Sequence, residues 1–199
     1  MDADLVGLLL AAGRGIRYDP SGHQLKLLAA ARCGPRAGAP LAVAAAAALA
    51  SVLPRVTAVV RPADSDSQRR LHRLLIDAGC RLAICDDADD GISASIACGV
   101  RAEPEATGWV LALADMPAIQ PSTVSAVASA MRAGAQTVAA VYRGTRGHPV
   151  GFAAGLRDEL LRLEGDTGAR SVLAAHAPLR VEVDDPGVLY DVDIMEERQ

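Results

Sequence analysis

The sequence predicts an α/β fold with a mostly parallel central sheet. Apolar runs alternate with helical patterns along the whole chain, which is the order expected of βαβ units. The segment Trp109–Ala114 is continuously apolar, as is typical of a strand that a parallel sheet buries on both faces. The 199 residues, 51% of them hydrophobic, suffice for one domain with a substantial core. We therefore expect a single domain over residues 1–199, without internal repeats or a linker.

The first half of the chain carries clear helix signals. The segment Pro40–Leu53 repeats apolar residues at helical spacing, with proline in the first turn. The pattern Ser65-x-x-Gln68 is a capping box that begins a second helix, and Gly79 ends that helix. The remaining predicted elements of this half are strands at Val6–Leu10, Val56–Val60 and Arg81–Cys85 and a short helix at Ser93–Val100.

The second half continues the same alternation of strands and helices. The segment Gly165–Arg170 is predicted to start a helix, with Asp166 or Thr167 as its N-cap. A polar segment, Arg143–His148, contains two glycines and is predicted as a turn between strands. The other predicted elements are helices at Pro121–Ala133 and Leu156–Leu163 and strands at Trp109–Ala114, Gln136–Tyr142, Val150–Phe152 and Leu179–Val183.

Charge and cysteine content exclude several function classes. The net charge of −4 and the pI near 5.5 argue against a general binder of nucleic acid or of anionic membranes. The four cysteines contain no C-x-x-C pair, which argues against a zinc site or a thioredoxin-like motif. No basic segment precedes the first apolar run, as a signal peptide would need, and Leu41–Leu53 is too short to span a bilayer. We therefore expect a cytoplasmic protein with reduced cysteines.

A glycine-rich turn follows the first strand, in the run Leu10-Ala11-Ala12-Gly13-Arg14-Gly15-Ile16-Arg17. Such a turn lets backbone N–H groups approach phosphate oxygens without a Cβ in the way. Arg14, Arg17 and Lys26 add positive charge around it, which favours a polyanionic ligand. Tyr18 stands where the dinucleotide fingerprint needs its third glycine, and the chain has no Gly-Lys-Ser/Thr run of a P-loop.

An acid ends the long central strand. Asp115 follows the apolar run directly, and the carboxyl ends of strands in an open α/β sheet face the ligand crevice. A metal-binding role is favoured over a turn or N-cap aspartate. The acidic run Asp86–Asp90 is different, because a dense charge run is usually a solvated loop, and we favour that interpretation over a metal cage.

The chain resembles a known enzyme family in six motifs that occur in the family's order. They are Leu10–Arg17 with a downstream lysine, Gly91–Ile96, Leu113–Pro117, Arg146–Val150, Gly165–Arg170 and Asp191–Asp193. The resemblance is to the MobA-like NTP transferase superfamily, and within it to the molybdenum cofactor cytidylyltransferases (MocA-like proteins). It implies a three-layer α/β/α Rossmann-like fold of the GT-A nucleotidyltransferase type.

The resemblance also implies roles for particular residues. Arg17 and Lys26 would hold the β- and γ-phosphates of the nucleotide, and Asp115 would bind Mg²⁺ together with Asp193 or, less favoured, Asp191. The nucleotide would lie against Leu10, Ala11, Ala12, Gly13, Arg14, Gly15 and Ser95. Arg146, His148 and Asp166 would contact the acceptor, with Arg143 as a further candidate. Ser95 and Asp166 have capping as an open alternative, and His148 is interpreted as structural or substrate-orienting rather than as a general base.

The implied reaction is transfer of CMP from CTP to a molybdopterin-type acceptor, with release of pyrophosphate. Ala12-Gly13 favours CTP, because the guanylyl branch of the family usually has Gly-Gly there. A molybdoenzyme that receives the product would be a further partner. The alternatives are guanylyl transfer, nucleotidyl transfer to a sugar or alcohol phosphate, and a non-catalytic accessory protein that binds the molybdenum cofactor.

Overall fold

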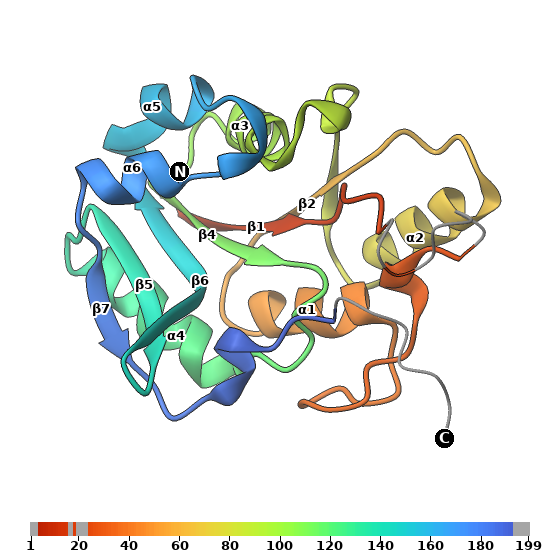
Figure 1. The fold of residues 1–199 in the computed structure, drawn as a ribbon, viewed down its shortest axis with the longest axis horizontal. Coiled ribbons are helices and arrows are strands. Elements are labelled where there is room, and N and C mark those ends of the chain that lie inside the picture. The colour runs from red at the N-terminus through yellow and green to blue at the C-terminus, as the bar shows by residue number, and fades with distance from the viewer. Residues whose placement is uncertain (1–3, 16–17, 19–23, 193–199) are drawn as a thin grey trace.

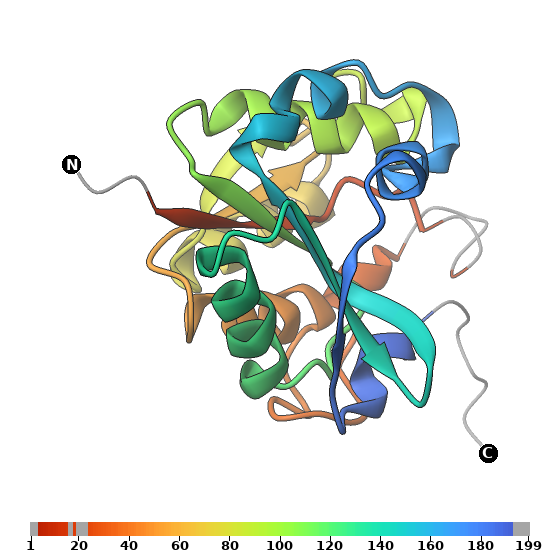
Figure 2. The same ribbon diagram turned by 90° about the vertical axis from the view of Figure 1, so that its left-hand side faces the viewer.

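The computed structural model describes residues 4–15, 18 and 24–192, and a seven-stranded sheet runs through its centre. The strand order is β3-β2-β1-β4-β6-β5-β7, and the sheet is parallel except for β6, which runs antiparallel to both of its neighbours (Figures 1 and 2). The predicted α/β fold with a mostly parallel sheet is confirmed. The strands are β1 (Leu5–Leu10), β2 (Val56–Val60), β3 (Arg81–Ile84), β4 (Gly108–Leu113), β5 (Thr137–Tyr142), β6 (Thr145–Ala153) and β7 (Leu179–Glu182).

Helices cover both faces of the sheet and complete a three-layer α/β/α arrangement (Figure 1). One face packs against α1 (Leu41–Ala50), α2 (Asp66–Asp77) and α4 (Pro121–Arg132). The other face packs against α3 (Ile92–Ala102), α5 (Arg157–Leu161) and α6 (Arg170–Ala175). Short 3-10 turns at Lys26–Leu28 (η1), Ala88–Asp90 (η2), Ala154–Leu156 (η3), Gly165–Thr167 (η4) and Pro186–Leu189 (η5) connect these elements.

The central strands of the sheet carry apolar residues on both faces and are buried there. All six residues of β1 are buried, and β1 lies between β2 and β4 with parallel pairing on each side. Helix α1 is rich in alanine and is buried on most of its surface, so its small side chains let it pack closely between the sheet and its neighbours. Helix α2 begins as predicted, with the Ser65 hydroxyl accepting a hydrogen bond from the Gln68 N–H at 3.2 Å.

The structure corrects three predictions in the second half of the chain. The predicted turn Arg143–His148 is only two residues long, because positive φ angles at Arg143 and Gly144 (48° and 78°) reverse the chain and β6 already begins at Thr145. The predicted helix at Leu156–Leu163 is present but shorter, since α5 covers only Arg157–Leu161 and follows the 3-10 turn η3. Neither Asp166 nor Thr167 caps a helix with its side chain, since α6 starts only at Arg170, after Gly168 at φ +57°.

The four cysteines are all free thiols, and only Cys33 is exposed. Within the residues that the structure describes, no helix combines the length and the apolar composition needed to cross a bilayer.

Candidate active site

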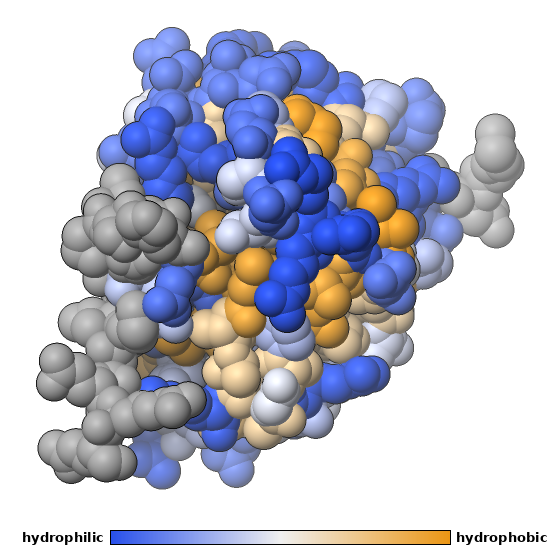
Figure 3. All heavy atoms as spheres, turned by 90° about the vertical axis from the view of Figure 1, so that its right-hand side faces the viewer, coloured by the Kyte–Doolittle hydropathy of each residue, from blue (hydrophilic) through white to orange (hydrophobic). Residues whose placement is uncertain are grey.

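A cleft of about 460 Å³ opens at the carboxyl ends of β1, β2 and β4. Seen from the side toward which β1 runs, hydrophilic and hydrophobic residues lie next to each other on the surface (Figure 3). The cleft walls come from the turn after β1, from η1, from the segment leading into α3, and from the end of β4. The predicted site residues that line it are Leu10, Ala12, Gly13, Arg14, Gly15, Lys26, Ser95, Asp115 and Asp166.

The other residues predicted to bind the nucleotide or the metal are Ala11, Arg17 and Asp193. Ala11 is buried in the core, and its N–H donates to the Val59 carbonyl at 2.8 Å, so this amide is already used by the sheet. Arg17 and Asp193 lie outside the described residues. The neighbouring Val192 N–H donates to the backbone carbonyl of Asp115 at 3.1 Å, so the chain just before Asp193 runs beside Asp115.

Glycine is favoured at positions 13 and 15, in the turn after β1, for different reasons. Gly15 has a φ of +64°, which favours glycine, and a Cβ there would lie 3.2 Å from the Cβ of Lys26. Gly13 lines the cleft, its φ lies outside the left-handed region, and a Cβ built on it would meet no atom of the described residues within 4 Å. Folding therefore does not require glycine at position 13, whereas a ligand approaching this backbone would.

Asp115 and Lys26 form an ion pair inside the cleft. The Lys26 Nζ lies 2.6 Å from the Asp115 Oδ2, and the two side chains are only 11% and 22% exposed. Asp115 is fixed by the end of β4, and Lys26 by the start of η1. A carboxylate and an ammonium at this distance can bind a metal–triphosphate complex together, the acid through the cation and the amine through phosphate oxygens.

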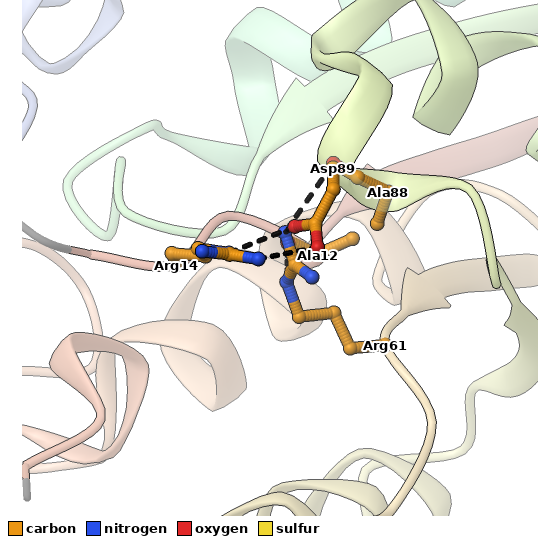
Figure 4. A network of polar contacts seen from close by, with 5 residues as sticks. All are labelled: Ala12, Arg14, Arg61, Ala88 and Asp89. Atoms are coloured by element: carbon orange, nitrogen blue, oxygen red, sulfur yellow. Dashed lines mark hydrogen bonds and ion pairs between the residues drawn. The ribbon is translucent and has the colours of Figure 1, made fainter. Parts of the chain in front are cut away.

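A second ionic cluster lines the same cleft and includes an arginine that the motifs did not indicate (Figure 4). Asp89 accepts hydrogen bonds from Arg14 through Nε at 2.8 Å and through Nη2, and its Oδ1 lies 2.6 Å from the Arg61 Nη2. The hydrogen bonds from Arg14 and then from Arg61 lower the pKa of Asp89, and the bond to Asp89 raises the pKa of Arg14. All four aspartates of the acidic run Asp86–Asp90 are exposed, in agreement with the solvated loop expected there, although Ala88 is buried.

Ser95 lies one turn inside α3 and lines the cleft. Helix α3 begins at Ile92 with Gly91 as its N-cap and no side-chain cap, so the alternative that Ser95 caps this helix is wrong. Gly91 has a φ of +105°, and a Cβ on it would lie 2.3 Å from the Asp166 Oδ1. Glycine at position 91 therefore lets the η4 turn, with Asp166, close over the start of α3.

Three of the predicted acceptor residues, Arg146, His148 and Asp166, line a second pocket of about 330 Å³ that adjoins the cleft, whereas the further candidate Arg143 does not. Both cavities share Ile92, Leu113 and Asp166, and the second also contains Arg146, His148 and Arg170 over a floor of aliphatic side chains and Phe152. Burial lowers the pKa of His148, against the opposing effects of the Leu111 carbonyl and the Asp115 charge. The imidazole is thus favoured as neutral, and the positive charge of this pocket comes from its arginines.

Comparison with known proteins places the chain in a family. Residues 7–181 match the profile of the MobA-like NTP transferase domain. The chain belongs to this family. No curated protein sequence matches it in a direct search. The family match and the common fold make the protein a nucleotidyltransferase of MobA-like type.

Solved structures of similar proteins share the fold over almost the whole chain. Rv0371c from Mycobacterium tuberculosis is 25% identical, with a TM-score of 0.75 and coverage of 96% of this chain and 94% of that one. A nucleotidyl transferase from Methanothermobacter is 23% identical, with a TM-score of 0.72 and coverage of 96% and 92%. Molybdopterin-guanine dinucleotide biosynthesis protein A from Archaeoglobus fulgidus is 18% identical, with a TM-score of 0.61 and coverage of 90% and 84%. A further structure of Rv0371c is a complex with manganese.

Proposed function

We propose that the protein transfers CMP from CTP to the phosphate of a molybdopterin-type acceptor and releases pyrophosphate. One observation carries the proposal. The glycine-rich turn, Lys26 and Asp115 meet in a single cleft, and the pocket with Arg146 and His148 adjoins it. A nucleotide in the first cavity and an acceptor in the second would place their reacting groups at the shared wall, where Asp166 stands.

The reaction joins two anions, so the protein must supply countercharge and alignment. An oxygen of the acceptor phosphate attacks the α-phosphorus of the nucleotide, and the bond from that phosphorus to the pyrophosphate oxygen breaks. Lys26, with Arg14 and Arg17, would balance the charge of the β- and γ-phosphates and of the departing pyrophosphate. The phosphate nucleophile is already ionised near neutral pH, so the reaction needs no general base at His148.

Mg²⁺ is the metal that we propose for this site. Among the described residues, no group of three His, Cys, Asp or Glu side chains could hold a metal by itself. A single carboxylate such as Asp115 still fits, because Mg²⁺ usually binds one or two carboxylates together with substrate phosphates and water. Asp193 is the proposed second ligand, with Asp191 as the alternative. The manganese complex of Rv0371c supports a divalent ion in this fold, and the ion would supply charge neutralisation of the triphosphate.

The choice of CTP rests on Ala12-Gly13, which differs from the Gly-Gly pair usual in guanylyl enzymes. The relative from Archaeoglobus fulgidus named for molybdopterin-guanine dinucleotide supports the acceptor class rather than the base. A molybdoenzyme that takes over the product is the partner that this reaction would need.

Thermal shift with CTP, GTP, ATP and UTP, each with Mg²⁺, followed by a transfer assay with molybdopterin, tests the proposal. We expect CTP to stabilise the protein most and to give a dinucleotide product. A preference for GTP would assign guanylyl transfer, and product with a sugar or alcohol phosphate alone would change the acceptor. Acceptor binding without any nucleotide response would indicate an accessory protein.

Asp115→Ala is the matching variant, expected to abolish turnover while the protein stays folded. Asp158→Ala is its control, because Asp158 is an acid on α5 that is 78% exposed and lines neither of the two cavities. Near-normal transfer by Asp115→Ala would contradict the role assigned to this carboxylate.

A further inference from the structure

Arg61 connects the two walls of the cleft. It follows β2 directly, so its side chain starts at the carboxyl edge of the sheet. Its Nε donates to the Ala12 carbonyl at 2.7 Å, and its Nη2 donates to the Ala88 carbonyl at 3.3 Å (Figure 4). One guanidinium therefore bonds the turn after β1 to the η2 segment before α3.

Arg61 is held more firmly than the other arginine of the cluster. Its side chain is 17% exposed, against 56% for Arg14. Its backbone carbonyl lies 2.9 Å from the Nε2 of His72 on α2, which fixes the main chain at this point. Arg61 is thus a largely buried, well-bonded part of the cleft wall, whereas the side chain of Arg14 is exposed to solvent.

The charges of this cluster matter for an anionic ligand. Arg14 and Arg61 share the single carboxylate of Asp89, which leaves one net positive charge beside the glycine-rich turn. When Arg14 turns to a bound triphosphate, it gives up its ion pair with Asp89. Without another partner, the Asp89 carboxylate would repel the phosphates. Arg61 prevents this, because its own ion pair with Asp89 remains when Arg14 changes partner.

We propose that Arg61 is a positioning residue of the nucleotide cleft, which holds the glycine-rich turn against the η2 segment and keeps Asp89 paired while Arg14 turns to the triphosphate. The proposal rests on the proposed function for its ligand, a nucleoside triphosphate. Its structural half, the bond between the two segments, concerns the free protein and is tested without any nucleotide.

Arg61→Met tests both halves, since methionine keeps an unbranched apolar stem and removes every donor of the guanidinium. Arg69→Met is the matched control: Arg69 also bonds a carboxylate and a carbonyl, Asp66 at 2.6 Å and Ala63 at 3.1 Å, but it lies on α2 and does not line the cleft. In the free protein, hydrogen exchange of the backbone amides of residues 12–15 and 88–90 should rise several-fold in Arg61→Met and stay unchanged in Arg69→Met.

Triphosphate binding, measured by titration calorimetry with CTP and Mg²⁺, should weaken by about tenfold or more in Arg61→Met, because the Asp89 carboxylate then loses its remaining partner when Arg14 turns to the triphosphate. Adding Asp89→Asn to Arg61→Met removes the unpaired acid and should restore most of the affinity, while exchange in residues 12–15 stays high. A residue with a merely structural role would not be rescued in this way.

Arg61→Lys provides a second route if the methionine variant fails to fold. Lysine keeps the charge beside Asp89 but has no fork to bond two carbonyls, so exchange should rise while affinity falls less. Unchanged exchange in both segments, or unchanged CTP affinity in a variant that has lost Arg61, would overturn the proposal. If the unmodified protein bound none of the four nucleotides, the proposed function would fail, and the exchange comparison alone would decide on Arg61.

Discussion

Replacing Gly13 by alanine separates the needs of folding from the needs of the ligand. Among the residues that the structure describes, the added methyl group would meet no atom within 4 Å, and the φ of Gly13 lies outside the left-handed region. Alanine also restricts the unfolded chain, which stabilises a protein by about 0.4–1 kcal/mol where the native backbone accepts it. For a chain of this length, we therefore expect the melting temperature to stay constant or to rise by up to about 4 °C.

The same methyl group would occupy the face of the turn that lines the cleft. If phosphate oxygens approach the backbone here, they must move away, and CTP affinity should fall by at least about tenfold, the equivalent of one lost charge-assisted hydrogen bond. Differential scanning calorimetry gives the stability, and titration calorimetry with CTP and Mg²⁺ gives the affinity. The prediction is thus a stable protein that no longer binds nucleotide well.

Two further glycines calibrate this experiment. Gly155→Ala places a Cβ 3.6 Å from the Gln136 Oε1, an ordinary contact at ordinary φ outside the cleft, and should change neither quantity. Gly15→Ala forces alanine to φ +64°, which costs about 1–2 kcal/mol, so it should lower the melting temperature. If Gly13→Ala bound CTP as tightly as the unmodified protein, the turn would not be the phosphate site; a loss of stability like that of Gly15→Ala would refute the packing argument.

Three other predictions address the cleft, the core and the thiols. Lys26→Ala should weaken CTP binding by about ten- to a hundredfold, because it removes a charged donor from a partly buried site, and calorimetry that shows no change would assign the phosphate contact to an arginine instead. Asp185→Ala should lower the free energy of unfolding by about 2–4 kcal/mol in urea titrations, because this buried carboxylate accepts hydrogen bonds from the Gln120 N–H, the Thr123 hydroxyl and the Gly187 N–H. Asp184→Ala, at the exposed neighbouring position, should change the free energy of unfolding little. Burial raises the pKa of Cys80 to about 11, so the stability that its neutral thiol provides is complete below the pKa of the unfolded state and is lost as the pH rises through about 11. The midpoint of urea unfolding should therefore fall less steeply over this pH range in Cys80→Ala than in the unmodified protein. In the native protein, iodoacetamide should label the exposed Cys33 before the buried Cys80.

Much of the fold was predictable because local signals and tertiary packing agree. The strand Val56–Val60 has the predicted bounds, since a buried parallel strand between turn residues is marked by its apolar run alone. The start of β6 was not predictable in the same way. Its polar residues Thr145 and Arg146, with Gly147, have the composition of a loop, and pairing with β5 across a two-residue turn makes them a strand.

The candidate site, like the fold, was predictable from the sequence only in part. Residues such as Gly13 and Asp115 could be assigned to one cleft from the sequence, because parallel strands bring their carboxyl ends to a shared edge of the sheet. Arg61 carried a weaker signal of the same kind, an arginine directly after a buried strand, but no motif marked it. Its role depends on two carbonyls and a carboxylate from segments far apart in the sequence, and only the packed structure brings these together.

The cations of the cleft are bonded to acids from distant segments, and this has a consequence for how a nucleotide enters. Arg14 pairs with Asp89, 75 residues away, and Lys26 pairs with Asp115, 89 residues away. These pairs hold the walls of the free cleft together, and they also keep the acids from repelling an approaching anion. In the proposed reaction, a triphosphate would replace the carboxylate partners of both cations. This would leave Asp115 for the proposed metal ion and Asp89 paired with Arg61 alone. Binding of the nucleotide and of the metal should therefore support each other, because each one compensates a charge that the other exposes.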